Sequence, residues 1–173
     1  MNLQQLSMVD PEGLRTIMRQ WASGVTIVTA MHEGQSHGMT VSSFTSISLT
    51  PPSVLIALER GVRTHSLVTA SGSFGVSVLA ENQQALSELF AQRNIPDLEH
   101  IEQIDLFFLK TGSPLLRESI ANLDCRVSTR YEVGTHTVFL GEVVDYFIGK
   151  PQSPLLYFDR SYATIKNMTG GEK

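Results

Sequence analysis

A long uncharged stretch limits what this chain can fold into. Residues 34–58 contain no Asp, Glu, Lys or Arg, although charged residues make up 17% of the sequence, and seven of the eleven side chains from Thr40 to Thr50 carry a hydroxyl. Exposed surfaces usually carry charge and membrane spans are apolar, so the stretch fits neither. Two interpretations stay open: half-buried strands whose hydroxyls bond to backbone, or a wall that binds a large, polar, mostly neutral ligand.

Length and charge narrow the class of protein. The chain has 173 residues, a net charge of −4 and 42% hydrophobic residues. This predicts one domain over residues 1–173. The acidic balance argues against nucleic-acid binding. No apolar run approaches the ~20 residues of a membrane span, and residues 1–5 do not look like a signal peptide. We expect a cytoplasmic protein with no membrane partner.

The N-terminal region predicts a helix that packs on a core. Asp10 before Pro11 is a typical N-cap followed by proline at the first helical position. Apolar residues then recur at helical spacing, ending with Trp21, which we expect in the core. Gly24 is expected to end this helix. The apolar positions are Leu14, Ile17, Met18 and Trp21.

The rest of the chain predicts mainly strands. Strand patterns cover residues 25–30, 39–49, 53–58, 74–78, 122–133 and 137–148, and within 122–133 polar and apolar residues alternate strictly. Thr64 is expected to cap a helix that ends at Gly72, and Asn82 a second one carrying Phe90. Residues 92–117 are expected to be irregular. The predicted fold is mainly β with flanking helices, as a single antiparallel barrel with helices outside.

The usual catalytic motifs are missing, which points to a bound cofactor. The sequence has no dinucleotide-binding glycine fingerprint, no P-loop, no His-Glu-x-x-His and no nucleophile elbow. Its one cysteine, Cys125, excludes an internal disulfide and reads as a small buried hydrophobe. We expect no metal site. If the protein is an enzyme, its reactive group is expected to be a cofactor.

Three segments in register resemble the flavin reductase-like family. They are WASGVTIVTA at 21–30, HGMTVSSFTSISLTPP at 37–52 with the apolar residues 54–58, and GTH at 134–136 running into FLGEV at 139–143. The resemblance spans about residues 12–165 and includes LLY at 155–157. It implies an antiparallel Greek-key split β-barrel of the FMN-binding type. It also implies hydride transfer from NAD(P)H to FMN or FAD.

The resemblance also implies where the flavin lies. Residues 40–43 would face the isoalloxazine ring, and Ser46 would lie near the ribityl or phosphate end. Arg63 and Thr64 would hold the phosphate at a helix N-terminus, where free N–H groups favour an anion. Phe90 resembles an aromatic residue near the flavin, although it also fits the core stripe of its helix. The implied cofactor-binding residues are Thr40, Val41, Ser42, Ser43, Ser46, Arg63, Thr64 and Phe90.

His136 resembles a histidine that positions the nicotinamide in this family. A hydrogen bond from it to the carboxamide would help to place the hydride donor against the flavin. Hydride transfer needs no proton abstraction, so this role is positioning. The other interpretation is an ordinary histidine at a hairpin. Thr135 stands where relatives usually have Asp, and this and other departures leave FMN or FAD, and NADH or NADPH, open.

The resemblance further implies a homodimer and a partner enzyme. Reduced flavin would diffuse freely to a flavin-dependent monooxygenase component. Two other functions remain open: a non-catalytic flavin- or haem-binding module on the same barrel, and a dimeric binding domain with no cofactor.

Overall fold

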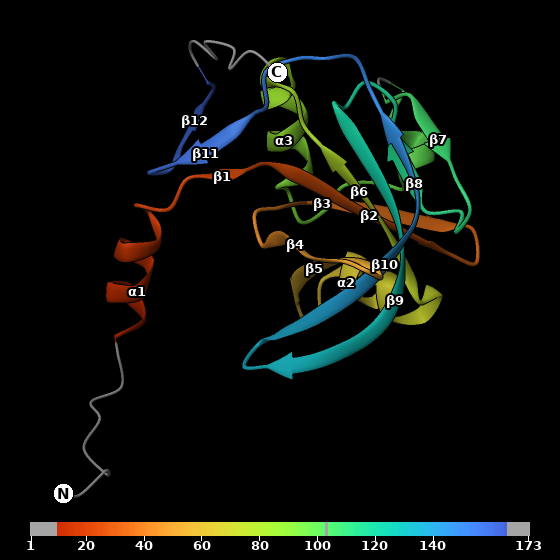
Figure 1. The fold of residues 1–173 in the computed structure, drawn as a ribbon, viewed down its shortest axis with the longest axis horizontal. Coiled ribbons are helices and arrows are strands. Elements are labelled where there is room, and N and C mark those ends of the chain that lie inside the picture. The colour runs from red at the N-terminus through yellow and green to blue at the C-terminus, as the bar shows by residue number, and fades with distance from the viewer. Residues whose placement is uncertain (1–9, 103, 166–173) are drawn as a thin grey trace, which may run out of the picture.

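A seven-stranded antiparallel sheet forms the body of the molecule (Figure 1). The computed structural model describes residues 10–102 and 104–165. The strand order is β3-β2-β6-β9-β10-β5-β4. The mainly β, antiparallel architecture with flanking helices therefore agrees with the prediction. The strands are β2 (Thr26–His32), β3 (Gln35–Val41), β4 (Phe44–Leu49), β5 (Pro52–Glu59), β6 (Ser73–Val78), β9 (Ala121–Val133) and β10 (His136–Ile148).

Two smaller sheets flank the main one. One contains β1 (Ser23–Gly24), β11 (Leu156–Phe158) and β12 (Ser161–Ala163). The other pairs β7 (Leu106–Phe108) with β8 (Pro114–Leu116). Residues 92–117 are thus less irregular than expected, since they also hold the 3-10 turn η3 (Leu98–His100).

The core lies on both faces of the sheet. Successive residues of a strand point to opposite faces, and both Ile27 and Val28 of β2 are fully buried. Val28 belongs to a cluster with Phe74 and Phe139 that α2 (Arg63–Ser71) covers, whereas Ile27 packs in a second cluster with Phe90 of α3 (Gln84–Phe90). The strand β2 is therefore the shared wall between the two clusters.

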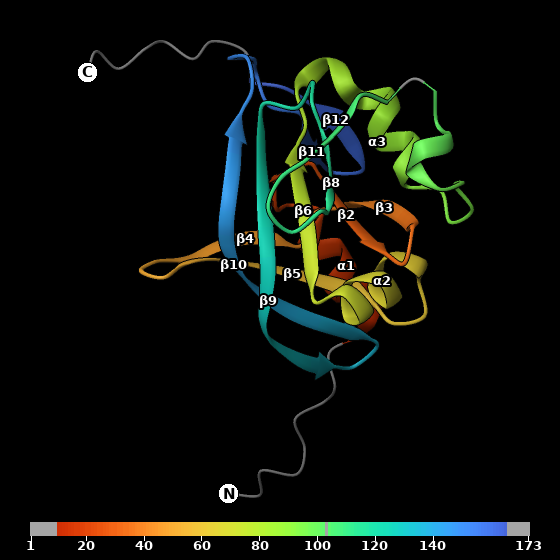
Figure 2. The same cartoon turned by 90° about the vertical axis from the view of Figure 1, so that its right-hand side faces the viewer.

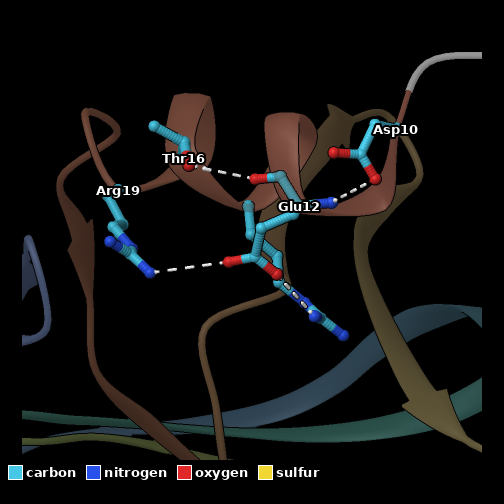
Figure 3. Close-up of polar contacts among 5 residues, drawn as sticks. Asp10, Glu12, Thr16 and Arg19 are labelled. Atoms are coloured by element: carbon cyan, nitrogen blue, oxygen red, sulfur yellow. Dashed lines mark hydrogen bonds and ion pairs between the residues drawn. The ribbon is translucent and has the colours of Figure 1, made fainter.

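Helix α1 (Pro11–Met18) is capped as predicted but packs differently. Asp10 accepts a hydrogen bond from the Glu12 amide, and the Glu12 carboxylate pairs with Arg15 and Arg19 (Figure 3). The helix ends at Met18 rather than near Gly24, and it buries no residue. Trp21 is 70% exposed, so its expected place in the core was wrong. Within the described residues no element covers this apolar stripe, and α1 stands beside the sheet (Figure 1).

The predicted strand over residues 39–49 is two strands, with a break at Ser42 and Ser43. The Ser43 hydroxyl donates to the Ala57 carbonyl at 2.7 Å and accepts from the Ala57 amide at 3.3 Å. A side chain therefore occupies the position that backbone groups would take in a continuous ladder.

Both predicted helix caps need correction. The N-cap of α2 is Val62, so Thr64 is the second residue of the helix, while Gly72 ends it in a left-handed conformation as expected. Asn82 lies in the 3-10 turn η2 (Glu81–Gln83), and it is the Gln83 side chain that accepts from the Ala80 amide. In both places the helix or 3-10 turn begins earlier than predicted, so the expected cap residue lies inside it.

Strand β9 reverses part of its predicted pattern. Asn122 and Asp124 are fully buried, whereas Tyr131 is 59% exposed. Asp124 accepts hydrogen bonds from the amide and hydroxyl of Thr111, and Asn122 accepts one from Ser77. Thr111, in the loop between β7 and β8, therefore satisfies the Asp124 carboxylate, whereas the partner of Asn122 comes from β6.

No helix in the described part of the chain is long and apolar enough to cross a membrane.

Candidate functional site

A cavity of about 980 Å³ opens between β3, the start of α2 and the end of α3. This volume lies at the upper end of the ~300–1,000 Å³ usual for small-molecule sites. Its wall combines hydroxyls, backbone groups and aromatic rings with two arginines and one glutamate. It is lined by Val25, His37, Met39, Thr40, Val41, Ser42, Glu59, Gly61, Val62, Arg63, Thr64, Ser87, Phe90, Ala91, Gln92, Arg93, Asn94, Ile95, Pro96, Tyr157 and Tyr162.

Most of the residues expected to bind flavin line this one cavity. Strand β3 and the residue after it contribute Thr40, Val41 and Ser42, α2 contributes Arg63 and Thr64, and α3 contributes Phe90. Ser43, Ser46 and His136 do not line it. Phe90 is 1% exposed, so it belongs to the core cluster and to the cavity wall together.

In the uncharged stretch 34–58, some hydroxyls bond to the backbone and some residues form a cavity wall, so both interpretations of its composition apply. The Thr40 hydroxyl donates to the Ser87 carbonyl at 2.6 Å, and Ser43 bonds to the backbone of β5 as described above. At the same time residues 39–42 form one wall of the cavity. The wall therefore has hydroxyls whose oxygens keep lone pairs, and no charge that a neutral ring would have to desolvate.

The N-terminus of α2 meets the requirements of an anion site. Its N-cap makes no side-chain hydrogen bond, and its first turn contains no acid. Within the described residues the amides of Arg63, Thr64 and His65 have no hydrogen-bond partner. Free N–H groups and the helix dipole both favour negative charge at this end.

His37 lies directly against this helix end. Its side chain is 4% exposed, and its Nδ1 is 2.7 Å from Thr64 Oγ1. Its Nε2 is buried and has no hydrogen-bond partner in the part of the chain that the structure describes. Burial, and then the Arg63 guanidinium, lower the pKa of His37, while Asp97 acts in the opposite direction. The imidazole is therefore neutral at pH 7 and carries one ring proton.

Arg63 is held by the segment that follows α3. Its guanidinium hydrogen-bonds to Asp97, which also accepts from the Ser36 amide at 3.1 Å. The Ser36 hydroxyl in turn accepts from the Leu98 amide at 3.0 Å. Burial alone would raise the pKa of Asp97, but the Ser36 amide and Arg63 outweigh it and hold that pKa below its usual value. The segment after α3 is thereby tied to both β3 and α2.

The remaining candidates lie outside the cavity. His136 is exposed at the start of β10, with its Nδ1 3.0 Å from the Thr135 hydroxyl, and it pairs in register with Glu59, which lines the cavity. Ser46 is exposed on the edge strand β4. Ser43 lines a second hollow of about 570 Å³ between α1, β4 and β11, which shares Ser42 and Tyr157 with the main cavity.

Sequence reasoning missed many of the side chains that line this cavity, among them three that make hydrogen bonds within its wall. His37, Ser87 and Tyr162 line it, and the Tyr162 and Ser87 hydroxyls are 2.9 Å apart. His37 begins the segment 37–52 that resembles the family, but no local pattern marks any of the three as part of a site, because the elements that bring them together are distant in sequence.

The side chains offer little chemistry of their own. Burial and the neighbouring Asp124 raise the pKa of the Cys125 thiol to about 12, so it is protonated at neutral pH. Among residues 10–102 and 104–165 no group of three or more His, Cys, Asp or Glu residues could hold a metal ion. A cofactor-sized cavity with an anion site on a mainly β antiparallel fold suits a phosphate-bearing cofactor.

Comparison with known proteins identifies the class. The model of the flavin reductase like domain matches residues 18–166. The chain therefore belongs to the flavin reductase-like family. It is 38% identical over 159 residues to the NADH-dependent flavin reductase StyB of Pseudomonas fluorescens, covering 89% of each chain. It is 37% identical over 142 residues to an NADH-dependent FAD reductase of Streptomyces globisporus, covering 79% of this chain and 78% of that one.

Solved structures share the fold. BorF, the flavin reductase component of a bacterial two-component tryptophan halogenase, superposes with a TM-score of 0.84 at 33% identity, over 91% of this chain and 99% of that one. The NADH:FAD oxidoreductase of Streptomyces globisporus in complex with NAD and FAD fragments gives 0.85 at 32%, over 94% and 99%. The expected split-barrel fold class is thereby confirmed.

Proposed function

We infer that this protein is an NAD(P)H-dependent flavin reductase that transfers a hydride from NAD(P)H to FMN or FAD. Membership of the flavin reductase-like family carries this conclusion. The cavity fits it, since it joins an uncharged hydroxyl wall to a helix N-terminus free of acids. The flavin supplies the hydride acceptor, and the chain binds and orients it.

The proposed flavin site follows the cavity wall. Residues 40–42 would face the isoalloxazine ring, whose edge carries both acceptors and a donor that hydroxyl and backbone groups can match. Arg63 and Thr64 would hold the phosphate, and Phe90 would pack near the ring. Ser43 and Ser46 stay in the proposal as contacts through the neighbouring hollow or from a second copy of the chain. His136, beside Glu59 at the rim, would position the nicotinamide.

A single assay tests the function. NADH or NADPH oxidation is followed at 340 nm with the purified protein and added FMN or FAD. We expect oxidation that depends on protein, flavin and pyridine nucleotide together. A protein that binds flavin but oxidises neither nucleotide would instead be a non-catalytic flavin-binding module.

We also propose a homodimer, formed through α1 and the edge strand β4. Apolar side chains are exposed along α1 and just after it, with Ile17 64% and Trp21 70% exposed. Strand β4 is an unpaired edge without a single charge, and the β4–β5 hairpin projects beyond the sheet (Figure 2). Such edges are normally protected by charge or by a partner. Both elements line the same hollow, so one partner surface would cover them together.

The partner that uses the product is proposed on the relatives. Several of them are named reductase components of two-component monooxygenases, among them that of a 4-nitrophenol 4-monooxygenase system of Rhodococcus opacus. Reduced flavin would reach such a component by free diffusion.

We keep the single-domain organisation as part of the proposal, supported by the family match over 18–166. A cytoplasmic location also stays a prediction, favoured because NAD(P)H is made there.

A further inference from the structure

The buried imidazole of His37 in the cavity wall makes only one hydrogen bond, which does not explain why a polar side chain is buried there. His37 is 96% buried, and only its Nδ1 has a hydrogen-bond partner, Thr64 Oγ1 at 2.7 Å. A buried polar atom without a partner costs free energy, and native proteins keep few of them without a functional reason. The group that His37 does contact is a hydroxyl at the anion-binding end of α2.

In the hydrogen bond between His37 and Thr64, either the Nδ1–H or the Thr64 hydroxyl can be the donor. The unpaired Nε2 of His37 favours one of these two arrangements. If Thr64 donated its proton, His37 would carry its own proton on Nε2, which would be a buried N–H without a partner. If Nδ1–H donates, the unpaired Nε2 is an acceptor instead. Orphaned buried N–H groups are rarer than unpaired acceptors, so the arrangement with Nδ1–H as donor is favoured.

The direction of this bond decides what Thr64 can do for a ligand. A phosphate has only acceptor oxygens, so Thr64 can bind one only with its single hydroxyl proton. That proton is free only when His37 donates to Thr64 Oγ1. The neutral imidazole has one proton to give, because burial and then Arg63 on α2 lower its pKa, while Asp97 on the segment after α3 acts in the opposite direction.

We propose that His37 is a positioning residue for the flavin phosphate: its Nδ1–H donates to Thr64 Oγ1 and so aims the Thr64 hydroxyl proton at the phosphate. The free amides at the start of α2 and the Arg63 guanidinium supply the other donors. This proposal rests on the proposed function and deepens it, because it explains why a histidine is buried beside the helix end.

The experiment compares FMN with riboflavin, which lacks the phosphate. Each is titrated by fluorescence quenching into the parent protein and into His37→Leu, His37→Asn, Thr64→Val and the double variant His37→Leu/Thr64→Val. The amide nitrogen of asparagine can occupy the place of Nδ1, so His37→Asn is the matched control that keeps the donor. The ratio of the two affinities removes general effects of folding.

The expected result is a loss of phosphate preference and nothing else. His37→Leu lowers the FMN-to-riboflavin affinity ratio about tenfold, the effect of one hydrogen bond to a charged group, and riboflavin affinity stays within about twofold of the parent. His37→Asn keeps the parent ratio. The double variant matches Thr64→Val alone, because His37 acts through Thr64.

Three results would overturn the proposal: an unchanged ratio in His37→Leu, an equal loss of both flavins, or fully additive losses in the double variant. A parent protein that binds FMN and riboflavin equally would also overturn it, while leaving reductase activity intact. If the parent neither binds flavin nor oxidises NAD(P)H, the proposed function itself fails, and the two failures are distinguishable. Should His37→Leu not fold, His37→Ala, which also lacks the donor, takes its place in the comparison with His37→Asn.

Discussion

Gly38 of β3 packs closely against Phe90, which lines the cavity. Adding one methyl group at Gly38 therefore tests whether this packing supports both the fold and the site. A Cβ at Gly38 would lie 2.7 Å from Phe90 Cε1, 3.0 Å from Phe90 Cδ1 and 3.1 Å from Thr29 Cγ2. Ordinary contact begins at 3.4 Å, so the Phe90 ring would have to move by about 0.7 Å. Phe90 is buried and also lines the cavity, so the displaced ring changes the core and the site together.

The expected cost follows from overpacking. Inserting a methyl group into a packed core costs about 1–3 kcal/mol, and replacing glycine in a strand returns about 0.5–1 kcal/mol. We expect Gly38→Ala to lower the free energy of unfolding by about 1–2 kcal/mol, and to weaken flavin binding. Gly24→Ala is the matched control, because a Cβ at that position meets nothing within 4 Å.

Urea unfolding and flavin titration measure the two effects on the same preparation. A smaller side chain at position 90 should relieve the clash, so Phe90→Leu should cost at least about 1 kcal/mol less in the Gly38→Ala background than in the parent. The reasoning is refuted if Gly38→Ala is as stable as Gly24→Ala, or if the two substitutions at positions 38 and 90 add without coupling.

Three further predictions follow from the charges and surfaces. His136→Ala should lower kcat/KM for NAD(P)H by roughly 5- to 150-fold, with flavin affinity nearly unchanged; unchanged kinetics would return His136 to a purely structural role. The pKa of Asp97 is lower in the folded protein than its ordinary value of 3.8. The ionised Asp97 carboxylate therefore stabilises the fold above about pH 4, and this stabilisation is lost as the pH falls through the pKa of the folded state. The stability difference between the parent and Asp97→Asn should therefore be largest above about pH 4 and shrink below it, as acid titration of unfolding would measure; a constant difference would exclude the linkage. Ile17→Asp should reduce the mass seen by light scattering toward the 19.1 kDa of one chain, whereas Thr16→Asp on the same helix should not; a parent that is already a monomer at micromolar concentration would contradict the dimer.

Local signals in the sequence located most elements of the fold. Asp10 caps α1 as predicted, and Gly72 ends α2 at a φ of 69°, a conformation that favours glycine. The alternation of β9 located the strand correctly but misassigned its faces, because the loop that buries Asp124 comes from residues thirteen positions earlier. Periodicity reports which residues share a face, and only tertiary contacts report what covers it.

Only part of the cavity wall was predicted from the sequence. Residues 40–42 and Thr64 line the cavity, as their predicted role requires, but Thr64 was taken for a cap when it is the second residue of α2. His37 was missed because its partner, Thr64, lies 27 residues further along the chain. A histidine within a strand has no spacing rule that distinguishes a structural role from a functional one.

The uncharged stretch is explained when the cavity and the edge strand are considered together. Residues 39–42 line the cavity, and β4 continues the same stretch as an exposed edge with Ile47 at 52% and Leu49 at 87% exposure. In the proposed flavin site a charge in the first part would have to be desolvated against a neutral ring, and in the proposed dimer a charge in the second part would be buried by the other copy. Both requirements act on one continuous segment, and the two hollows meet at Ser42. Flavin binding and dimer formation should therefore be thermodynamically linked, with added flavin lowering the concentration at which the chain dimerises.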